Sequence, residues 1–342
     1  MNRKTISILT PCFNEEPGIA ECHRQIRELF ETRLAGYDYE HVFIDNCSAD
    51  RTVEILRDLA ANDPRLKVIV NSRNFGAARS SFHGLLATKG DAVVPVLADL
   101  QTPPDIIPEM VARWEKGCRM VVAVRTGAEE GWFLRQCRKI FYKLMTRFSG
   151  VQQISNFIGF GLYDSSVVQV MRELHEPDPY FRGMVVEIGF EKEFIEYHQP
   201  SRRHGKSSYT FVSLLDYAVL GLTSHSKVPL RIMTIVGVTL SALSMLIALS
   251  YLVIKLVRWQ TFELGLAPLL IGTFFFASVQ LLFVGLIGEY VGAIYAQVKA
   301  RPLVIERERI NFEESDARLQ STAPSTTADA LPMRDTLPGR AG

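Results

Sequence analysis

The chain has 342 residues, of which 47% are hydrophobic and 22% are charged, and its formal net charge is +1. This length provides for one sizeable core and an additional region. A charge so close to neutral offers no basic excess for nucleic acid, and we expect no nucleic-acid partner. The average composition combines two different regions. Residues 1 to about 226 alternate apolar runs with charged stretches, as a soluble α/β domain does, whereas two later runs contain no charge.

Short β-rich runs alternate with amphipathic stretches in the first region. The runs are Ile6–Pro11, His41–Asp45, Leu66–Asn71 and Ala92–Leu97, and the stretches lie near 17–32, 51–61, 75–88 and 104–116. This alternation predicts an α/β domain with a mostly parallel sheet. Ligands of such sheets bind beyond the carboxyl ends of the strands, so the polar residues after each run are candidate site residues. They are Asn14, Glu15, Asp45, Asn46, Arg73, Asn74, Asp99 and Gln101.

A basic, aromatic stretch, FLRQCRKIFYKLMTRF, follows the run Met120–Arg125 at residues 133–148. Its cationic side chains are interleaved with aromatic and aliphatic ones, which predicts a helix lying in a membrane interface. A helix packed on the core with a solvated basic face is the alternative. The same two interpretations apply to Tyr209–His225.

Two uncharged runs, Ile232–Ile254 and Leu264–Gly288, dominate the second region. Each is long enough to cross a bilayer, which takes roughly 20 apolar residues. Because only Lys255–Glu263 separates them, we predict a transmembrane hairpin within 227–298 whose ends return to the same side. Core helices of a large soluble domain are the alternative. Basic residues outnumber those of the loop at the outer ends, and the positive-inside rule then predicts both termini in the cytoplasm. The outer residues are Lys227, Arg231, Lys299, Arg301 and Arg307, against Lys255 and Arg258 in the loop.

The predicted organisation is therefore a cytosolic domain at 1–226, the hairpin, and a cytosolic segment at 299–342. No apolar signal segment precedes the first strand, so we expect a multi-pass protein of the inner (cytoplasmic) membrane whose domain is not exported. Residues after about 316 are rich in Ser, Thr, Ala and Pro and are predicted to be disordered. Gly285, Gly288 and Gly292 fall along one helix, which favours a homo-oligomer packed through the hairpin; lipid-facing glycines are the alternative.

Carboxylates at strand ends can hold a divalent cation on a diphosphate. Asp45 in FIDNCSADRT and Asp99 with Gln101 in VLADLQTPPD each follow a strand-like run. Oxygen ligands suit Mg²⁺ or Mn²⁺, which bind through few protein groups plus substrate phosphates. An Asp after a strand is also a common helix cap, and Asp50 fits that interpretation.

Several segments resemble, in order, the successive motifs of glycosyltransferase family 2 enzymes, which have the GT-A fold. These are PCFNEE at 11–16, IDNCSADRT at 44–52, RNFG at 73–76, ADLQTPP at 98–104 and VAVR at 122–125. RRHGKSSY at 202–209 resembles the R-x-x-G-x-S-x-Y segment of the polyprenyl-phosphate branch, which includes dolichol-phosphate mannose synthase and bacterial undecaprenyl-phosphate glucosyltransferases. GEYVGAIYAQVKARP at 288–302 resembles the end of that branch's second transmembrane helix. The resemblance covers about residues 5–307.

The resemblance implies roles for individual residues. It implies a nucleotide pocket, a metal site with Mg²⁺ or Mn²⁺ on the diphosphate, an acceptor-phosphate site, and a loop that closes over the phosphates. The nucleotide pocket would be lined by Pro11, Phe13, Asn14, Glu15, Asp45 and Asn46, and the metal would be held by Asp99 and Gln101. Arg125, Arg135, Arg138 and Ser207 would meet the acceptor phosphate, with Asp99, Arg125 and Arg202 as the catalytic set. Arg135 and Arg138 could equally be snorkelling surface charges.

The sequence departs from the family pattern at two positions. Relatives usually read D-A-D where this chain has Leu97-Ala98-Asp99, which removes one possible metal ligand. They read V-D-D-G-S where this chain has Asn46, which keeps hydrogen-bonding capacity without charge.

No general base is evident in the motifs, and a lipid phosphate does not require one. A phosphate monoester has its second pKa near 6 and is largely dianionic at pH 7. The expected reaction is direct displacement at the anomeric carbon, with inversion. The default donor is UDP-linked glucose or a related hexose, and the acceptor is polyprenyl (undecaprenyl) phosphate. An aminoarabinose-type sugar is the next choice, and the pathway would be modification of cell-envelope polysaccharide or lipopolysaccharide.

Two alternatives remain open. A processive polysaccharide synthase shares such a nucleotide-binding domain, but this chain lacks a Q-x-x-R-W segment and has only two predicted spans. A non-catalytic, membrane-anchored nucleotide-sugar binder is suggested by Leu97 and Asn46.

Overall fold

The computed structural model describes residues 3–126, 154, 156–200, 228–257, 266–299 and 301–313. Its centre is an eight-stranded sheet with the strand order β7-β5-β6-β4-β1-β2-β3-β8. The strands are β1 Thr5–Cys12, β2 Asp38–Asp45, β3 Leu66–Asn71, β4 Ala92–Pro95, β5 Met120–Thr126, β6 Phe157–Asp164, β7 Lys192–His198 and β8 Glu306–Ile310. The helices around it are α1 Ile19–Thr32, α2 Thr52–Asn62, α3 Ala77–Ala87, η1 Pro104–Ile106, α4 Ile107–Glu115, α6 Ser165–Glu173 and α7 Phe181–Glu187.

Most of the sheet is parallel, as the sequence predicts. β1 pairs with β2 and β4, β2 with β3, and β5 with β7 in parallel, whereas β6 and β8 are antiparallel to their neighbours. The central strands are near-continuous apolar runs because helices cover both of their faces. The register sets Cys12 beside Asp45 and Asp45 beside Val70, so the carboxyl ends of β1, β2 and β3 reach one edge.

Side chains alternate between two cores, one on each face of the sheet. Ile8 packs on the side of α1, α2 and α4, while its neighbour Leu9 packs on the side of α3, α6 and α7. Gly84 lets α3 approach closely, because a Cβ at this position would lie 2.7 Å from Leu9 Cδ1 and 2.8 Å from Ile44 Cγ2. The amino end of α3 is thereby held over the carboxyl edge of the sheet.

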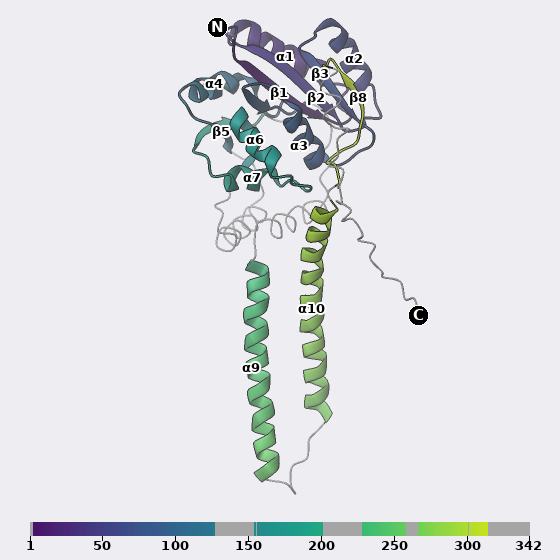
Figure 1. The fold of residues 1–342 in the computed structure, drawn as a ribbon, viewed down its shortest axis with the longest axis vertical. Coiled ribbons are helices and arrows are strands. Elements are labelled where there is room, and N and C mark those ends of the chain that lie inside the picture. The colour runs from purple at the N-terminus through teal and green to yellow at the C-terminus, as the bar shows by residue number, and fades with distance from the viewer. Residues whose placement is uncertain are drawn as a thin grey trace, which may run out of the picture.

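Strand β8 returns the chain to the domain after the long helices. It pairs antiparallel with β3, at the edge of the sheet, and Figure 1 shows it beside β3 at the end of α10. The sequence analysis assigned no strand here, and it also assigned none of β6, β7, α6 and α7.

Two long helices, α9 Val228–Val257 and α10 Leu266–Val298, extend away from the sheet domain (Figure 1). They are in contact, since a Cβ at Gly237 of α9 would lie 3.8 Å from Phe283 Cε2 of α10. Gly272–Gly292 in α10 is the described stretch that is long and apolar enough to span a membrane, and none of it is buried in the protein. α9 contributes a shorter apolar stretch, Met233–Ile247. The structure thus supports one membrane span by composition, and the two-span hairpin stays a prediction.

Candidate functional site

The loops after β1 and β2 are joined at the carboxyl edge by side-chain hydrogen bonds. Asn14, at φ +55°, donates its backbone N–H to Ser48 Oγ over 2.8 Å, and its Oδ1 accepts from the N–H of Ala49 over 2.8 Å. Asp45 is fully buried at the end of β2, where it accepts from the backbone N–H and the hydroxyl of Ser48. Phe13, in the loop after β1, is 41% exposed, and its ring is available to a planar ligand. Three of the predicted nucleotide-binding residues, Phe13, Asn14 and Asp45, therefore lie at this edge. Pro11, near the end of β1, and Glu15, in the loop after it, are both half-buried.

Asp50 ties the same loops to the start of α2. Its carboxylate accepts from the backbone N–H groups of Glu16, over 3.1 Å, and Thr52, over 3.0 Å, and from the Thr52 hydroxyl. Burial alone would raise the pKa of Asp50, but these hydrogen bonds outweigh it and hold the pKa below its ordinary value. Glu15 donates its backbone N–H to Thr52 Oγ1 over 2.9 Å. Asp50 therefore supports the helix start, the alternative role that the sequence left open.

Asn46 is the centre of a network of amide groups. Only 5% exposed, it donates from Nδ2 to Asn74 Oδ1 over 2.9 Å, and its Oδ1 accepts from Asn71 Nδ2 and from the N–H of Phe75. Asn74 Oδ1 also accepts from the N–H of Gly76, at the start of α3. The side chain of Asn46 thus holds the loop after β3. The sequence analysis had placed Asn46 in the nucleotide pocket and did not predict this structural role.

The predicted metal-binding residues Asp99 and Gln101 share one turn after β4. Gln101 donates its backbone N–H to Asp99 Oδ1 over 3.1 Å, and Leu100 between them has φ +56°. Thr102 Oγ1 accepts from the N–H of Leu97 over 2.8 Å. Over the described residues there is no group of three or more His, Cys, Asp or Glu side chains that could hold a metal ion. A cation here would depend on these few oxygens and on substrate phosphates, which suits Mg²⁺ or Mn²⁺.

Arg125 and Gln101 meet through a residue that the sequence analysis missed. Gln199, just after β7, accepts from Arg125 Nη1 over 2.7 Å and donates to Gln101 Oε1 over 2.8 Å. Its strand KEFIEYH is charged and mostly exposed, so no apolar pattern marked the strand or the residue after it. Ser48 was missed as well, although its spacing of three from Asp45 is the usual signal of a local side-chain bond. The remaining predicted residues, Arg135, Arg138, Arg202 and Ser207, lie outside the described residues, as do 133–148 and Tyr209–His225.

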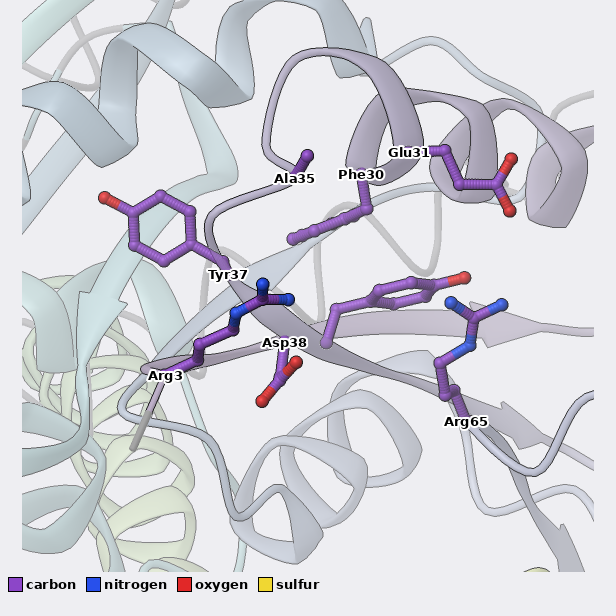
Figure 2. Close-up of a pocket in the computed structure, with 8 residues that line it drawn as sticks. Arg3, Phe30, Glu31, Ala35, Tyr37, Asp38 and Arg65 are labelled. Atoms are coloured by element: carbon purple, nitrogen blue, oxygen red, sulfur yellow. The ribbon is translucent and has the colours of Figure 1, made fainter. Parts of the chain in front are cut away.

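A surface pocket of about 340 Å³ lies at the opposite edge of the sheet (Figure 2). Its lining includes Asp38, the first residue of β2, whereas Asp45 ends that strand at the predicted site. Phe30 and Tyr39 stack in it with ring centroids 4.4 Å apart, and Arg65 lies over the Tyr39 ring. None of the predicted site residues lines this pocket, so it is separate from the candidate site.

A mostly parallel α/β sheet with polar loops along one carboxyl edge defines a GT-A-like domain. Residues 7–172 match the family Glycosyl transferase family 2. Similarity to curated proteins extends further along the chain. It is 34% identical over 308 residues to "Uncharacterized glycosyltransferase YkcC" of Bacillus subtilis (strain 168), covering 90% of this chain and 94% of that protein. It is 33% identical over 305 residues to "Bactoprenol glucosyl transferase" of Shigella phage SfX, covering 89% of this chain and 99% of that protein.

The chain belongs to glycosyltransferase family 2, and it is a glycosyltransferase. Among solved structures it is similar to the mannosyltransferase PcManGT from Pyrobaculum calidifontis in complex with GDP-Man and Mn²⁺, at 16% identity and a TM-score of 0.43, covering 87% of this chain and 88% of that one.

Proposed function

We propose that this protein transfers a sugar, glucose or a related hexose, from a nucleoside diphosphate donor, UDP in the first instance, to polyprenyl phosphate at the cytoplasmic face of a membrane. One observation carries the proposal. The family match ends at residue 172, but the similarity to the bactoprenol glucosyl transferase of Shigella phage SfX covers 89% of this chain and therefore extends into the region of the long helices. A soluble acceptor would need no such helices.

On the donor side, the proposed nucleotide pocket is the pair of joined loops after β1 and β2. Phe13 offers an exposed ring to the base, while buried Asp45 is held rigidly by Ser48. Rigid loops reduce the ordering that binding would otherwise require. Asn14 and Glu15 belong to the same pocket, and Asn46 supports it from below through the loop after β3.

The side-chain oxygens in the turn after β4 are few, but they are of the kind that binds a divalent cation. Asp99 and Gln101 provide oxygens from a single turn, and Mg²⁺ or Mn²⁺ held there would neutralise charge on the diphosphate leaving group. Asp99 and Gln101 would orient the ion, and Arg202, from the segment at 202–209, would add a positive charge to the same leaving group. The aspartate missing at Leu97 makes the phosphates the larger part of the coordination.

On the acceptor side, the lipid phosphate is already dianionic at pH 7, so the protein's task is to orient it and to stabilise charge. Arg125 lies near the end of β5, at the same edge as the turn that contains Asp99 and Gln101, which we call the cation turn. Its guanidinium would meet the acceptor phosphate together with Arg135, Arg138 and Ser207. Attack of a phosphate oxygen on the anomeric carbon then expels the nucleoside diphosphate from the opposite face, with inversion.

The path of the chain supports a membrane hairpin with both of its outer ends on the same side, which the charge distribution predicts to be the cytoplasmic side. Strands β1 to β7 precede α9, and β8 follows α10, yet all belong to one sheet. The outer ends of α9 and α10 must therefore lie on the same side of any membrane. If α10 crosses, the chain before it has to cross as well, and among the described residues we assign that second crossing to α9.

The test is transfer of radiolabelled sugar from a panel of UDP- and GDP-sugars to polyprenyl phosphate by the purified protein, with Mg²⁺, Mn²⁺ or EDTA, for the natural chain and for Asp99→Ala. We expect metal-dependent lipid labelling that Asp99→Ala abolishes, and an inverted anomeric configuration in the product. Labelling that survives both EDTA and Asp99→Ala would keep the activity and reject the metal site. Absence of labelling with every donor would favour the binder alternative.

A further inference from the structure

Three strands bring Gln101, Arg125 and Gln199 to the same edge of the sheet. β5 and β7 are parallel to each other, and both β4 and β5 are antiparallel to β6, so all three of β4, β5 and β7 run in one direction. Gln101 follows β4, Arg125 is near the end of β5, and Gln199 follows β7. Gln199 therefore lies between Gln101, which belongs to the cation turn, and Arg125, which is proposed to meet the acceptor phosphate.

The direction of the two hydrogen bonds is fixed by chemistry. A guanidinium group has only donors, so Gln199 must turn its Oε1 to Arg125 Nη1, where the distance is 2.7 Å. Its Nε2 then faces Gln101 and can only donate. Gln101 must in turn present its Oε1 to Gln199, over 2.8 Å. Arg125 thus determines, through Gln199, which end of the Gln101 amide faces this contact.

The surrounding backbone keeps this arrangement in register. The N–H of Arg125 donates to the carbonyl of Asn156 over 3.2 Å, and Thr126 Oγ1 donates to the carbonyl of Tyr197 over 3.1 Å. Thr126 pairs with His198, the residue before Gln199. Neither the arginine nor the glutamine can shift without disturbing the end of the β5–β7 pairing.

A glutamine can serve a cation through its oxygen only, since its amide nitrogen carries two hydrogens and no available lone pair. A free amide turns easily by half a revolution, and half of its orientations would present the wrong atom. The Gln101 oxygen has two lone pairs, one of which accepts from Gln199 while the second stays available.

We propose that Gln199 is a positioning residue that holds the Gln101 amide in the orientation a divalent cation requires, and that it links the cation turn to the acceptor-side Arg125. This inference rests on the proposed function. It identifies a residue outside all of the motifs that the sequence offered, and it gives Arg125 a second task besides meeting the acceptor.

The test measures Mn²⁺ binding by electron paramagnetic resonance, with UDP and without acceptor, so that it does not depend on turnover. Gln199→Met keeps the length of the side chain but removes both hydrogen bonds. We expect it to weaken Mn²⁺ binding about three- to tenfold, the range for one lost orienting hydrogen bond. Gln169→Met is the matched control, because Gln169 lies on the exposed face of α6, and it should bind as the natural chain does.

A double-mutant cycle separates positioning from a general loss of structure. In a Gln101→Met background there is no amide left to orient, so adding Gln199→Met should have no further effect on Mn²⁺ binding. Equal additional loss in that background would overturn the inference, as would unchanged binding in Gln199→Met alone. Thermal unfolding of each variant identifies misfolding, and Gln199→Leu serves as a second variant should Gln199→Met unfold.

The two proposals fail in different ways. Sugar transfer by a protein that binds no Mn²⁺, in any variant, rejects the metal site and this inference while keeping the transferase. Mn²⁺ binding that is insensitive to Gln199 but abolished by Asp99→Ala rejects only the inference.

Discussion

At the scale of single residues, Asn46 is one of the two departures from the family pattern, and the structure gives a physical reason for an amide at this position. Its Nδ2 donates to an oxygen, Asn74 Oδ1, that already accepts from the N–H of Gly76. A carboxylate at position 46 could accept from Asn71 and Phe75 but could not supply this donor. Asn46 and Asn74 therefore act as a matched pair that fixes the loop after β3.

Asn46→Asp should destabilise the protein, because an oxygen would then face Asn74 Oδ1, and Asn74 cannot turn without losing Gly76. We expect a loss of about 1–3 kcal/mol in the free energy of unfolding, the cost of a buried polar group left unpaired. Denaturant unfolding of the purified protein measures it. Asn62→Asp, at an exposed position that ends α2, should change stability by no more than about 0.5 kcal/mol. Equal stability of the two variants would mean that Asn74 reorganises at no cost.

A second prediction at this scale concerns two buried histidines. His41 Nε2 bonds to Thr10 Oγ1 over 2.9 Å, His41 Nδ1 to His23 Nδ1 over 3.2 Å, and His23 Nε2 lies 3.7 Å from Asp63. Burial lowers the pKa of both rings, that of His41 well below its ordinary value of 6.5. The folded protein therefore holds both rings neutral, whereas the unfolded chain protonates them near pH 6.5.

The sign follows by linkage, because the unfolded state binds more protons below pH 6.5. This contribution to stability is complete above that pH and is lost on acidification, at up to about 1.4 kcal/mol per pH unit for each ring. Unfolding free energies at pH 7.5, 6.5 and 5.5 measure the slope. His41→Gln should reduce the slope, and His175→Gln, an exposed control, should leave it unchanged. A slope that His41→Gln does not alter would contradict the prediction.

At the scale of elements, the sequence analysis found the first five strands and missed the last three. β7 and β8 carry no apolar run, whereas β6, FIGFGLYD, does carry one and was still not assigned. β1 to β5 are buried from both faces, so Val and Ile runs mark them. β8, ERERI, has four charged residues in five and reads as a solvated segment. It pairs with β3, and its glutamates pair with charged side chains of α2 and α3, which no local pattern can reveal. The candidate site was also predicted in part. Loop motifs indicated Asp45, Asp99 and their neighbours, whereas the hydrogen bonds of Gln199 depend on the pairing of β5 with β7 and have no local signal.

β8 is held in place by charge pairs of unequal burial. Glu306, with 12% of its side chain exposed, accepts from His83 of α3 and from Arg309. Glu308 is 36% exposed and pairs with Arg57 of α2. Burial would raise the pKa of Glu306, but the bonds from Arg309 and His83 lower it from 4.5 to about 2.

Glu306→Gln should therefore reduce stability at pH 7 by about 1–3 kcal/mol, since the amide keeps the shape and loses the charge-assisted bonds. A carboxylate with a lowered pKa stabilises the fold above pH 4.5 and loses this effect as the pH falls towards about 2. The difference in melting temperature between the natural chain and Glu306→Gln should then shrink across that interval. Glu308→Gln, in the more exposed pair, should have a smaller effect at pH 7. A difference that does not vary with pH would assign the effect to packing alone.

At the scale of the whole molecule, β8 connects the long helices to the candidate site. It follows α10 directly, and the N–H of Ser72, in the loop that Asn46 holds, donates to the carbonyl of Ile305 over 2.9 Å. Asn311, just beyond β8, donates to the carbonyls of Ala60 and Leu66. β8 and the loop after β3 thus belong to one hydrogen-bonded unit, and the chain reaches it a few residues after the end of α10.

The last prediction concerns how often the chain crosses the membrane. Strands that precede α9 and the strand that follows α10 belong to one sheet, so the chain between them must cross the membrane an even number of times. Thr261→Cys, between the two helices, should react with a membrane-impermeant maleimide in intact cells, whereas Ser321→Cys, near the C-terminus, should react only after permeabilisation. Cys47 and Cys118, both partly exposed in the domain, serve as internal controls for the cytoplasmic side, read by peptide mass spectrometry. If Thr261→Cys were protected in intact cells and labelled only with Cys47, both helices would lie on the cytoplasmic surface. Labelling of Ser321→Cys from outside while Cys47 stays protected would instead contradict the pairing of β8 with β3, since that strand cannot join the sheet from across the membrane.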